Sequence, residues 1–119
     1  DGPTLKEGVD RIEKVYAKIG EIAITDRTLV WNTDLAEAME YDNLIAQAAV
    51  TVTGAANRTE SRGAHAREDF PDRDDKDWMK HTLAWLDIPT GKVSIDFRPV
   101  HSNTMTNEIE TIPPKKRVY

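Results

Sequence analysis

Charged side chains are concentrated in one stretch of this chain, residues 58–75, which reads RTESRGAHAREDFPDRDD and holds four arginines, six acidic residues and one histidine. A guanidinium offers a planar fork of donors that pairs with carboxylates in a fixed geometry. Alternating arginines and acidic residues therefore predict a polar segment that docks on a partner surface. We call residues 58–75 the arginine-rich segment.

Several residues of this segment are our candidates for a docking surface. They are Arg58, Arg62, His65, Arg67, Asp69 and Arg73. Isolated ion pairs on a surface contribute little to stability, whereas the centres of interfaces are enriched in arginine. The density of arginines is our reason for preferring an interface to a solvated surface. For the histidine, the plainer interpretation is a hydrogen-bonded structural residue.

Other chemistry finds little support in the sequence. His65 and Asp69 would share one face only if the segment were helical, and a metal site would still need His81 or His101 as a third ligand. A nucleophilic pair of Ser61 and His65 lacks a carboxylate placed to orient the imidazole. No P-loop, GxGxxG, HExxH or GxSxG pattern occurs. We therefore predict no metal, no bound cofactor and no catalytic residue in this chain.

Length and composition narrow the possible functions. The chain has 119 residues, no cysteine and a net charge of -5, with a pI near 5.2. This is one small domain without disulfides, and its acidic balance argues against binding nucleic acid or anionic membranes. Because it opens with Asp1 in place of Met, we expect a segment of a longer protein.

An amphipathic helix is predicted over residues 4–19. Thr4 and Glu7 form a capping-box pattern, and Gly20 is expected to end the helix in the left-handed conformation. Apolar residues recur with three- and four-residue spacing and predict one buried stripe. The stripe consists of Leu5, Val9, Ile12, Tyr16 and Ile19.

A second, longer helix is predicted from Thr33 to about Asn57. Asn32 is expected to cap it, with Trp31 packing on its first turn as a hydrophobic staple. The preceding residues, 21–31, are interpreted as a connector that buries side chains. Two antiparallel helices alone give a thin core, so we expect a further layer from the tail, from another chain or from sequence upstream.

Two strands are predicted after the arginine-rich segment. His81–Asp87 and Lys92–Val100 flank the turn residues 88–91, which favours a β-hairpin. We interpret the three tryptophans of the chain as packing residues. The predicted fold is mainly α, with an antiparallel helical bundle at 1–57, a docking loop at 58–77, and a β-hairpin with an extended tail at 78–119.

Residues 60–75 resemble the C-terminal signature of the succinate dehydrogenase and fumarate reductase flavoprotein subunits. The match is long, and Phe70-Pro71-Asp72 places it closer to succinate dehydrogenase. Residues 25–35, 78–84 and 113–119 also resemble stretches of this family. The resemblance therefore covers essentially the whole chain.

The resemblance implies a non-catalytic C-terminal part of such a subunit. The parent would carry covalent FAD, oxidise succinate to fumarate and pass electrons to an iron–sulfur subunit and quinone. Its catalytic and FAD-binding residues would lie upstream, so none is assigned here. The family's helical domain is a spectrin-repeat-like bundle of three helices, of which this chain would hold the second and third.

The same resemblance implies partners and a location. The arginine-rich segment would brace the flavin-binding domain of the same subunit, and the parent would contact the iron–sulfur subunit. It would be a peripheral subunit on the cytoplasmic face of the bacterial inner membrane or on the matrix face in mitochondria, and this segment itself would be soluble.

Two other interpretations stay open at this point. One is a free-standing helical module that binds a partner chain through its apolar faces. The other, an independent small enzyme, would require a metal or a nucleophile that the sequence does not assemble. Whichever interpretation holds, two helices and one hairpin cannot cover both apolar helix faces, so we expect the isolated chain to self-associate.

Overall fold

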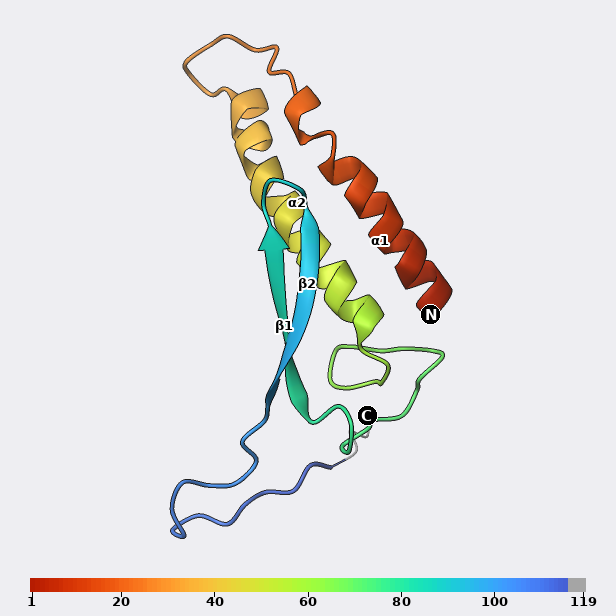
Figure 1. Cartoon of the computed structure of the whole chain (residues 1–119). Coiled ribbons are helices and arrows are strands. Elements are labelled where there is room, and N and C mark those ends of the chain that lie inside the picture. Colours follow the sequence, from red (N-terminus) through yellow and green to blue (C-terminus); the bar gives the residue numbers. More distant parts are fainter. Residues whose placement is uncertain (116–119) are drawn as a thin grey trace.

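Two helices, a polar loop and a β-hairpin follow one another along the chain (Figure 1). The computed structural model describes residues 1–115, so the last part of the predicted tail, 116–119, lies outside the described residues. The elements are α1 (Gly2–Tyr16), a 3₁₀ turn η1 (Ile19–Glu21), α2 (Thr33–Asn57), β1 (Lys80–Asp87) and β2 (Lys92–Pro99). The prediction of a mainly helical chain that ends in a hairpin is confirmed.

Helix α1 begins and ends earlier than predicted. The side chain of Asp1 caps it by accepting a hydrogen bond from the Thr4 amide at 2.9 Å, so the predicted Thr4 capping box is wrong. Pro3 stands in the first turn, where its missing N–H costs nothing. The helix ends at Tyr16 and continues as η1, and Gly20 is not left-handed. The reason is tertiary, because the Tyr16 hydroxyl is fixed by donating to the Ile88 carbonyl at 2.9 Å.

Helix α2 has the predicted bounds. Asn32 caps it, with its side-chain oxygen accepting from the Leu35 amide at 2.8 Å. The predicted staple is wrong, because Trp31 is 92% exposed. Its backbone is left-handed, with φ 54°, and the side chain does not pack on the first turn of α2.

The connector between the helices buries less than predicted. Leu29 and Val30 are 98% and 73% exposed, and Ile22 is 43% exposed, while Ile24 is half-buried. Apolar character alone therefore overestimated the burial of this connector.

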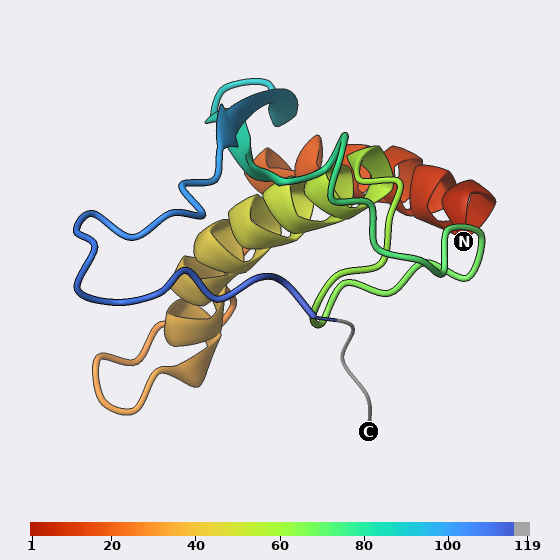
Figure 2. The ribbon, with the colours of Figure 1, turned by 90° about the horizontal axis from the view of Figure 1, so that it is seen from below.

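The hairpin is antiparallel, with Ala84 opposite Ile95 and Leu86 opposite Val93. Figure 2 shows the two helices side by side with the hairpin on one side of them. Its turn closes through Gly91, whose φ is 70°. Since side chains alternate along a strand, one face of the hairpin packs toward α2 and the other faces away.

The core is small and lies where α1, α2 and the hairpin turn meet. Among the described residues the buried apolar side chains are Tyr16, Ile45 and Ala49, with Leu86 and Val93 packed against them. The tryptophans contribute less than predicted. Trp31 and Trp85 are 92% and 64% exposed, and Trp78 is half-buried in an edge-to-face contact with Phe97.

Candidate functional site

The arginine-rich segment is folded on itself without helix or strand. Arg62 and His65 exchange backbone hydrogen bonds of 2.8 and 3.1 Å around Gly63, whose φ is 60°. The Ser61 hydroxyl accepts from the Arg67 amide at 2.8 Å, so it holds the loop. His65 and Asp69 therefore do not share a helical face, and the Ser61 hydroxyl is used structurally.

Glu60 is the centre of the segment and is fully buried. One carboxylate oxygen accepts from Arg62 Nε at 2.8 Å and from Arg58 Nη1, and the other accepts from Arg62 Nη2 at 3.0 Å and from the Asp74 amide at 2.9 Å. Burial alone would raise the pKa of Glu60, but the hydrogen bonds from Arg62, the Asp74 amide and Arg58 bring it below its usual value. The carboxylate thus stays charged and organises the loop.

Sequence reasoning did not single out Glu60. The available signal was its position two residues from an arginine on each side, at 58 and 62. A carboxylate between two guanidiniums is well placed to bind both when the chain turns.

Arg58 joins the end of α2 to the start of β1. Its guanidinium donates to the carbonyl of Trp78 at 3.1 Å, to the carbonyl of Lys80, and to the Thr82 hydroxyl at 3.1 Å. It also lies over the Trp78 ring, 4.9 Å from the centroid. Most hydrogen-bond donors of the Arg58 guanidinium are therefore used within its own chain.

Arg67 and Asp69 connect the two helices. Arg67 is 4% exposed and donates to the carbonyls of Ala55, Ala56 and Arg58 at 3.1–3.4 Å, which are the last carbonyls of α2 and its cap. It also holds both oxygens of Asp69 at 2.7 Å, and Asp69 accepts from the Gly2 amide at 2.8 Å.

The charges of this pair match the two helix ends. A cation suits the C-terminus of a helix, and an anion suits the N-terminus. The hydrogen bonds to Arg67, and next the bond from the Gly2 amide, hold the pKa of Asp69 well below its usual range against the opposing effect of burial. The same pairing raises the pKa of Arg67.

The remaining candidates lie nearer the surface. The Arg62 and Arg73 side chains are 28% and 26% exposed, and both pair with Asp75 at 2.8 Å. Arg73 also donates to the Lys115 carbonyl at 2.7 Å, and half-buried His65 lies 3.2 Å from the Arg58 carbonyl. All six candidates therefore lie in one folded loop. Arg58 and Arg67 point toward its interior, and the others lie nearer the surface.

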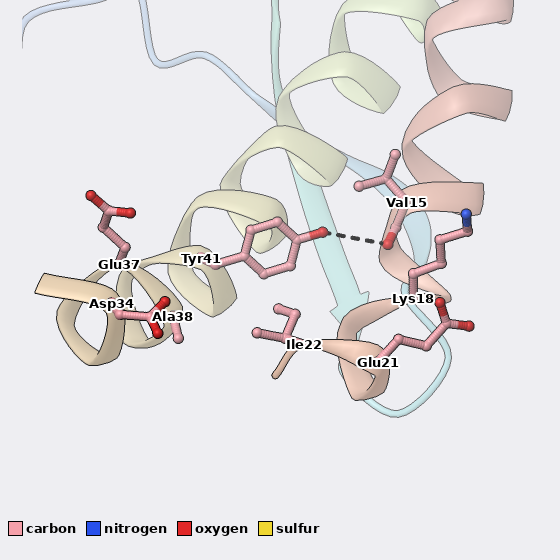
Figure 3. Close-up of a pocket in the computed structure, with 8 residues that line it drawn as sticks. All are labelled: Val15, Lys18, Glu21, Ile22, Asp34, Glu37, Ala38 and Tyr41. Carbon is pink, nitrogen blue, oxygen red and sulfur yellow. Dashed lines mark hydrogen bonds between the residues drawn. The ribbon is translucent and has the colours of Figure 1, made fainter. Parts of the chain in front are cut away.

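A groove of about 390 Å³ lies between the end of α1 and the start of α2, away from the arginine-rich segment (Figure 3). Its floor is apolar, and the Tyr41 hydroxyl reaches the Val15 carbonyl at 3.5 Å. Charged residues stand at its edge. The lining residues are Val15, Lys18, Glu21, Ile22, Asp34, Glu37, Ala38 and Tyr41. This shape suits an apolar side chain from a neighbouring element.

Two features are absent from the described residues. Within residues 1–115, no three histidine or acidic side chains are grouped as a metal ion would need. Over the same residues, no helix combines the length and apolarity required to cross a bilayer.

Comparison with known proteins agrees with this architecture. The family described as fumarate reductase flavoprotein C-term matches residues 1–119. The chain is 55% identical over 115 residues to the succinate dehydrogenase flavoprotein subunit of Rickettsia conorii, covering 97% of this chain and 19% of that protein. It is 49% identical over 116 residues to the mitochondrial succinate dehydrogenase [ubiquinone] flavoprotein subunit of Oryza sativa, covering 98% and 18%.

A solved structure gives the same result. The FrdA chain of a mutant E. coli quinol fumarate reductase matches with a TM-score of 0.80 and 32% identity, over 99% of this chain and 19% of that one. This chain thus spans about one fifth of the length of the relatives it matches. The predicted resemblance is confirmed, and the chain belongs to the C-terminal family of succinate dehydrogenase and fumarate reductase flavoproteins.

Proposed function

We propose that this chain is the non-catalytic C-terminal segment of a succinate dehydrogenase flavoprotein subunit and that it braces the flavin-binding domain. In this proposal the whole subunit binds FAD, oxidises succinate to fumarate and delivers electrons to an iron–sulfur subunit and quinone. The names of its relatives support the class of parent protein. The segment itself supplies no catalytic group.

The observation that carries the bracing role is an excess of accessible surface. The chain exposes 9,734 Å², whereas a compact monomer of 13.4 kDa exposes roughly 6,500 Å². Its radius of gyration is 19.4 Å, against about 13.5 Å for a compact domain of this length. An excess on the order of 3,000 Å², to which the exposed residues 101–115 contribute, is of the size that a large protein–protein interface buries.

The excess of accessible surface also favours a part of a larger subunit over a free-standing module. A module that folds alone would bury more of its own apolar surface, yet Met39 and Leu44 on α2 are each 65% exposed. The groove between α1 and α2 is a suitable seat for the third helix of a spectrin-repeat-like bundle. In this proposal that helix comes from the preceding part of the same subunit.

On the arginine-rich segment, the partly exposed residues are the ones that would contact the flavin-binding domain. Arg62, Arg73 and His65 keep donors or ring atoms near the surface. Glu60 and Asp75 hold Arg62, and Asp75 also holds Arg73. A preorganised polar surface loses little side-chain entropy on docking.

The test is Arg62→Ala in the complete subunit. We expect reduced flavin content and reduced assembly with the iron–sulfur subunit, measured by flavin absorbance per protein and by co-purification. Arg11→Ala is the matched control, because Arg11 and Glu7 form an exposed ion pair on α1 at 3.9 Å. Wild-type flavin content and assembly in Arg62→Ala would contradict the proposal.

A further inference from the structure

The loop between the helices carries three consecutive exposed apolar residues at its end. Leu29, Val30 and Trp31 are 98%, 73% and 92% exposed, and we call them the apolar tip. The tip lies at the end of the helical pair opposite the N-terminus and the arginine-rich segment (Figure 1). It is not part of the surface discussed above.

Polar contacts hold the base of the tip in one shape. Asp34 accepts from the Asp26 amide at 3.0 Å and from the Thr25 amide at 2.6 Å, and these hydrogen bonds lower the pKa of Asp34. The Asn32 side chain donates to the carbonyls of Asp26 and Thr28 at 3.1 and 2.9 Å. A loop ordered in advance loses little conformational entropy when it binds.

Local structure gives no reason for a tryptophan at position 31. Its φ of 54° is left-handed, a conformation that glycine or asparagine adopts at lower cost than an aromatic residue. With 92% of its surface exposed, Trp31 has little packing within residues 1–115 to offset that cost. Tryptophan is, however, one of the side chains enriched at the energetic centres of interfaces.

We propose that the apolar tip is an anchor that inserts into an apolar recess in the remainder of its own subunit. This rests on the proposed function, in which that remainder exists. The curated relatives are about five times as long as this chain, so the remainder holds roughly 500 residues and is about 60 Å across. Helix α2, with 25 residues, is about 37 Å long. One body can therefore contact both the arginine-rich segment and the tip.

The elongated shape agrees with the same occupant. The molecule extends over 61 Å along its longest axis. Contact at the arginine-rich segment alone would leave the groove and the tip uncovered. A body that lies along the helical pair covers all three.

The experiment places a single thiol at the tip of the complete, flavin-loaded subunit by Trp31→Cys and follows maleimide labelling, located by peptide mass. The control is Lys14→Cys, on the exposed charged face of α1. In the subunit alone we expect labelling at position 31 to be at least tenfold slower than at position 14, and the two rates to become equal in denaturant.

Equal rates in the native subunit would overturn the proposal. Protection that arises only after the iron–sulfur subunit is added would also overturn it, since the recess would then belong to that subunit. If Trp31→Cys fails to fold, hydrogen exchange of the unmodified subunit decides. Amides of residues 29–31 should exchange at least tenfold more slowly than in an unstructured peptide, and unprotected exchange would refute burial.

The outcome is separable from the test of the proposed function. A reactive tip together with flavin loss in Arg62→Ala would refute the anchor and leave the bracing role intact. A protected tip together with wild-type flavin content in Arg62→Ala would refute the bracing role and leave the anchor intact.

Discussion

At the scale of single residues, the arginine-rich segment first holds its own chain together. Arg67 uses its fork of donors on the carbonyls that end α2 and on the Asp69 carboxylate. Glu60 binds Arg58 and Arg62 while fully buried. Within residues 1–115, no buried side-chain nitrogen or oxygen lacks a hydrogen-bond partner.

The fork of Arg67 should matter as much as its charge. Arg67→Lys keeps the cation but loses the bidentate contact with Asp69 and most bonds to the carbonyls of α2. We expect a loss of about 2 kcal/mol in the free energy of unfolding, measured by urea unfolding of the chain. Arg98→Lys, at an exposed position on β2, should change nothing, and equal stabilities of the two variants would contradict this role.

Acid should destabilise the fold through Glu60. Because the folded-state pKa of Glu60 is below its unfolded value, its contribution is complete above about pH 4.5 and is lost as pH falls through the folded-state pKa. The lowered pKa of Asp69 acts in the same direction. Thermal unfolding from pH 7 to pH 3 should show a falling midpoint.

Glu60→Gln is the check on that assignment. It should be less stable than the wild type at pH 7, because Arg58 and Arg62 lose their buried counter-charge. Its midpoint should also fall less between pH 5 and pH 3. A pH profile parallel to that of the wild type would assign the acid sensitivity to other carboxylates.

The sequence predicted that arginines and carboxylates would pair, but not which ones turn inward. In a helix, i and i+4 positions share a face, whereas in a loop the spacing of Glu60 and Arg62 does not define a side. Burial of Arg67 depends on contact with the end of α2 and with Gly2, and those contacts join residues far apart in the chain. Docking of these residues to a flavin-binding domain stays a prediction.

At the scale of elements, the hairpin is held on the helices at its turn. Gly91 is buried, and a Cβ there would lie 2.3 Å from the Tyr16 ring. The Tyr16 hydroxyl donates to the Ile88 carbonyl in the same turn. Tyr16, at the end of α1, therefore contacts the hairpin turn through both its ring and its hydroxyl.

Gly91→Ala should separate these elements. The added methyl meets the Tyr16 ring and strains a φ of 70°, so we expect a loss of about 2–3 kcal/mol, measured by urea unfolding. Gly20→Ala is the control, because a Cβ at that position has nothing within 4 Å. If both variants unfold at the same denaturant concentration, the turn does not anchor the hairpin.

Element boundaries were predictable where local signals acted alone. Helix α2 has its cap at Asn32 and a long run without proline, and its predicted bounds are confirmed. Helix α1 was misplaced at both ends, because Asp1 is the better cap and because Tyr16 is fixed by the hairpin. The staple at Trp31 failed because its backbone is left-handed, which sequence gives little reason to expect in an aromatic residue.

At the scale of the whole molecule, the chain is elongated and leaves large apolar side chains exposed. We expect the chain alone to self-associate through the faces that include Met39, Leu44 and the groove. Light scattering should give a mass above 13.4 kDa at high concentration. Adding the flavin-binding domain of the same subunit should convert the assembly into a one-to-one complex, whereas a stable monomer indifferent to that domain would contradict the proposal.

The contacts at the two ends of α1 also set the order in which the protein can fold during synthesis. The Gly2 amide meets Asp69, 67 residues later, and Tyr16 meets Ile88, 72 residues later. At ribosomal speeds of about 5–20 residues per second, the first helix waits roughly 4–14 s for its partners. During that interval α1 can already pack on α2, but its two ends lack these contacts, so the chain should complete its fold only after the hairpin emerges.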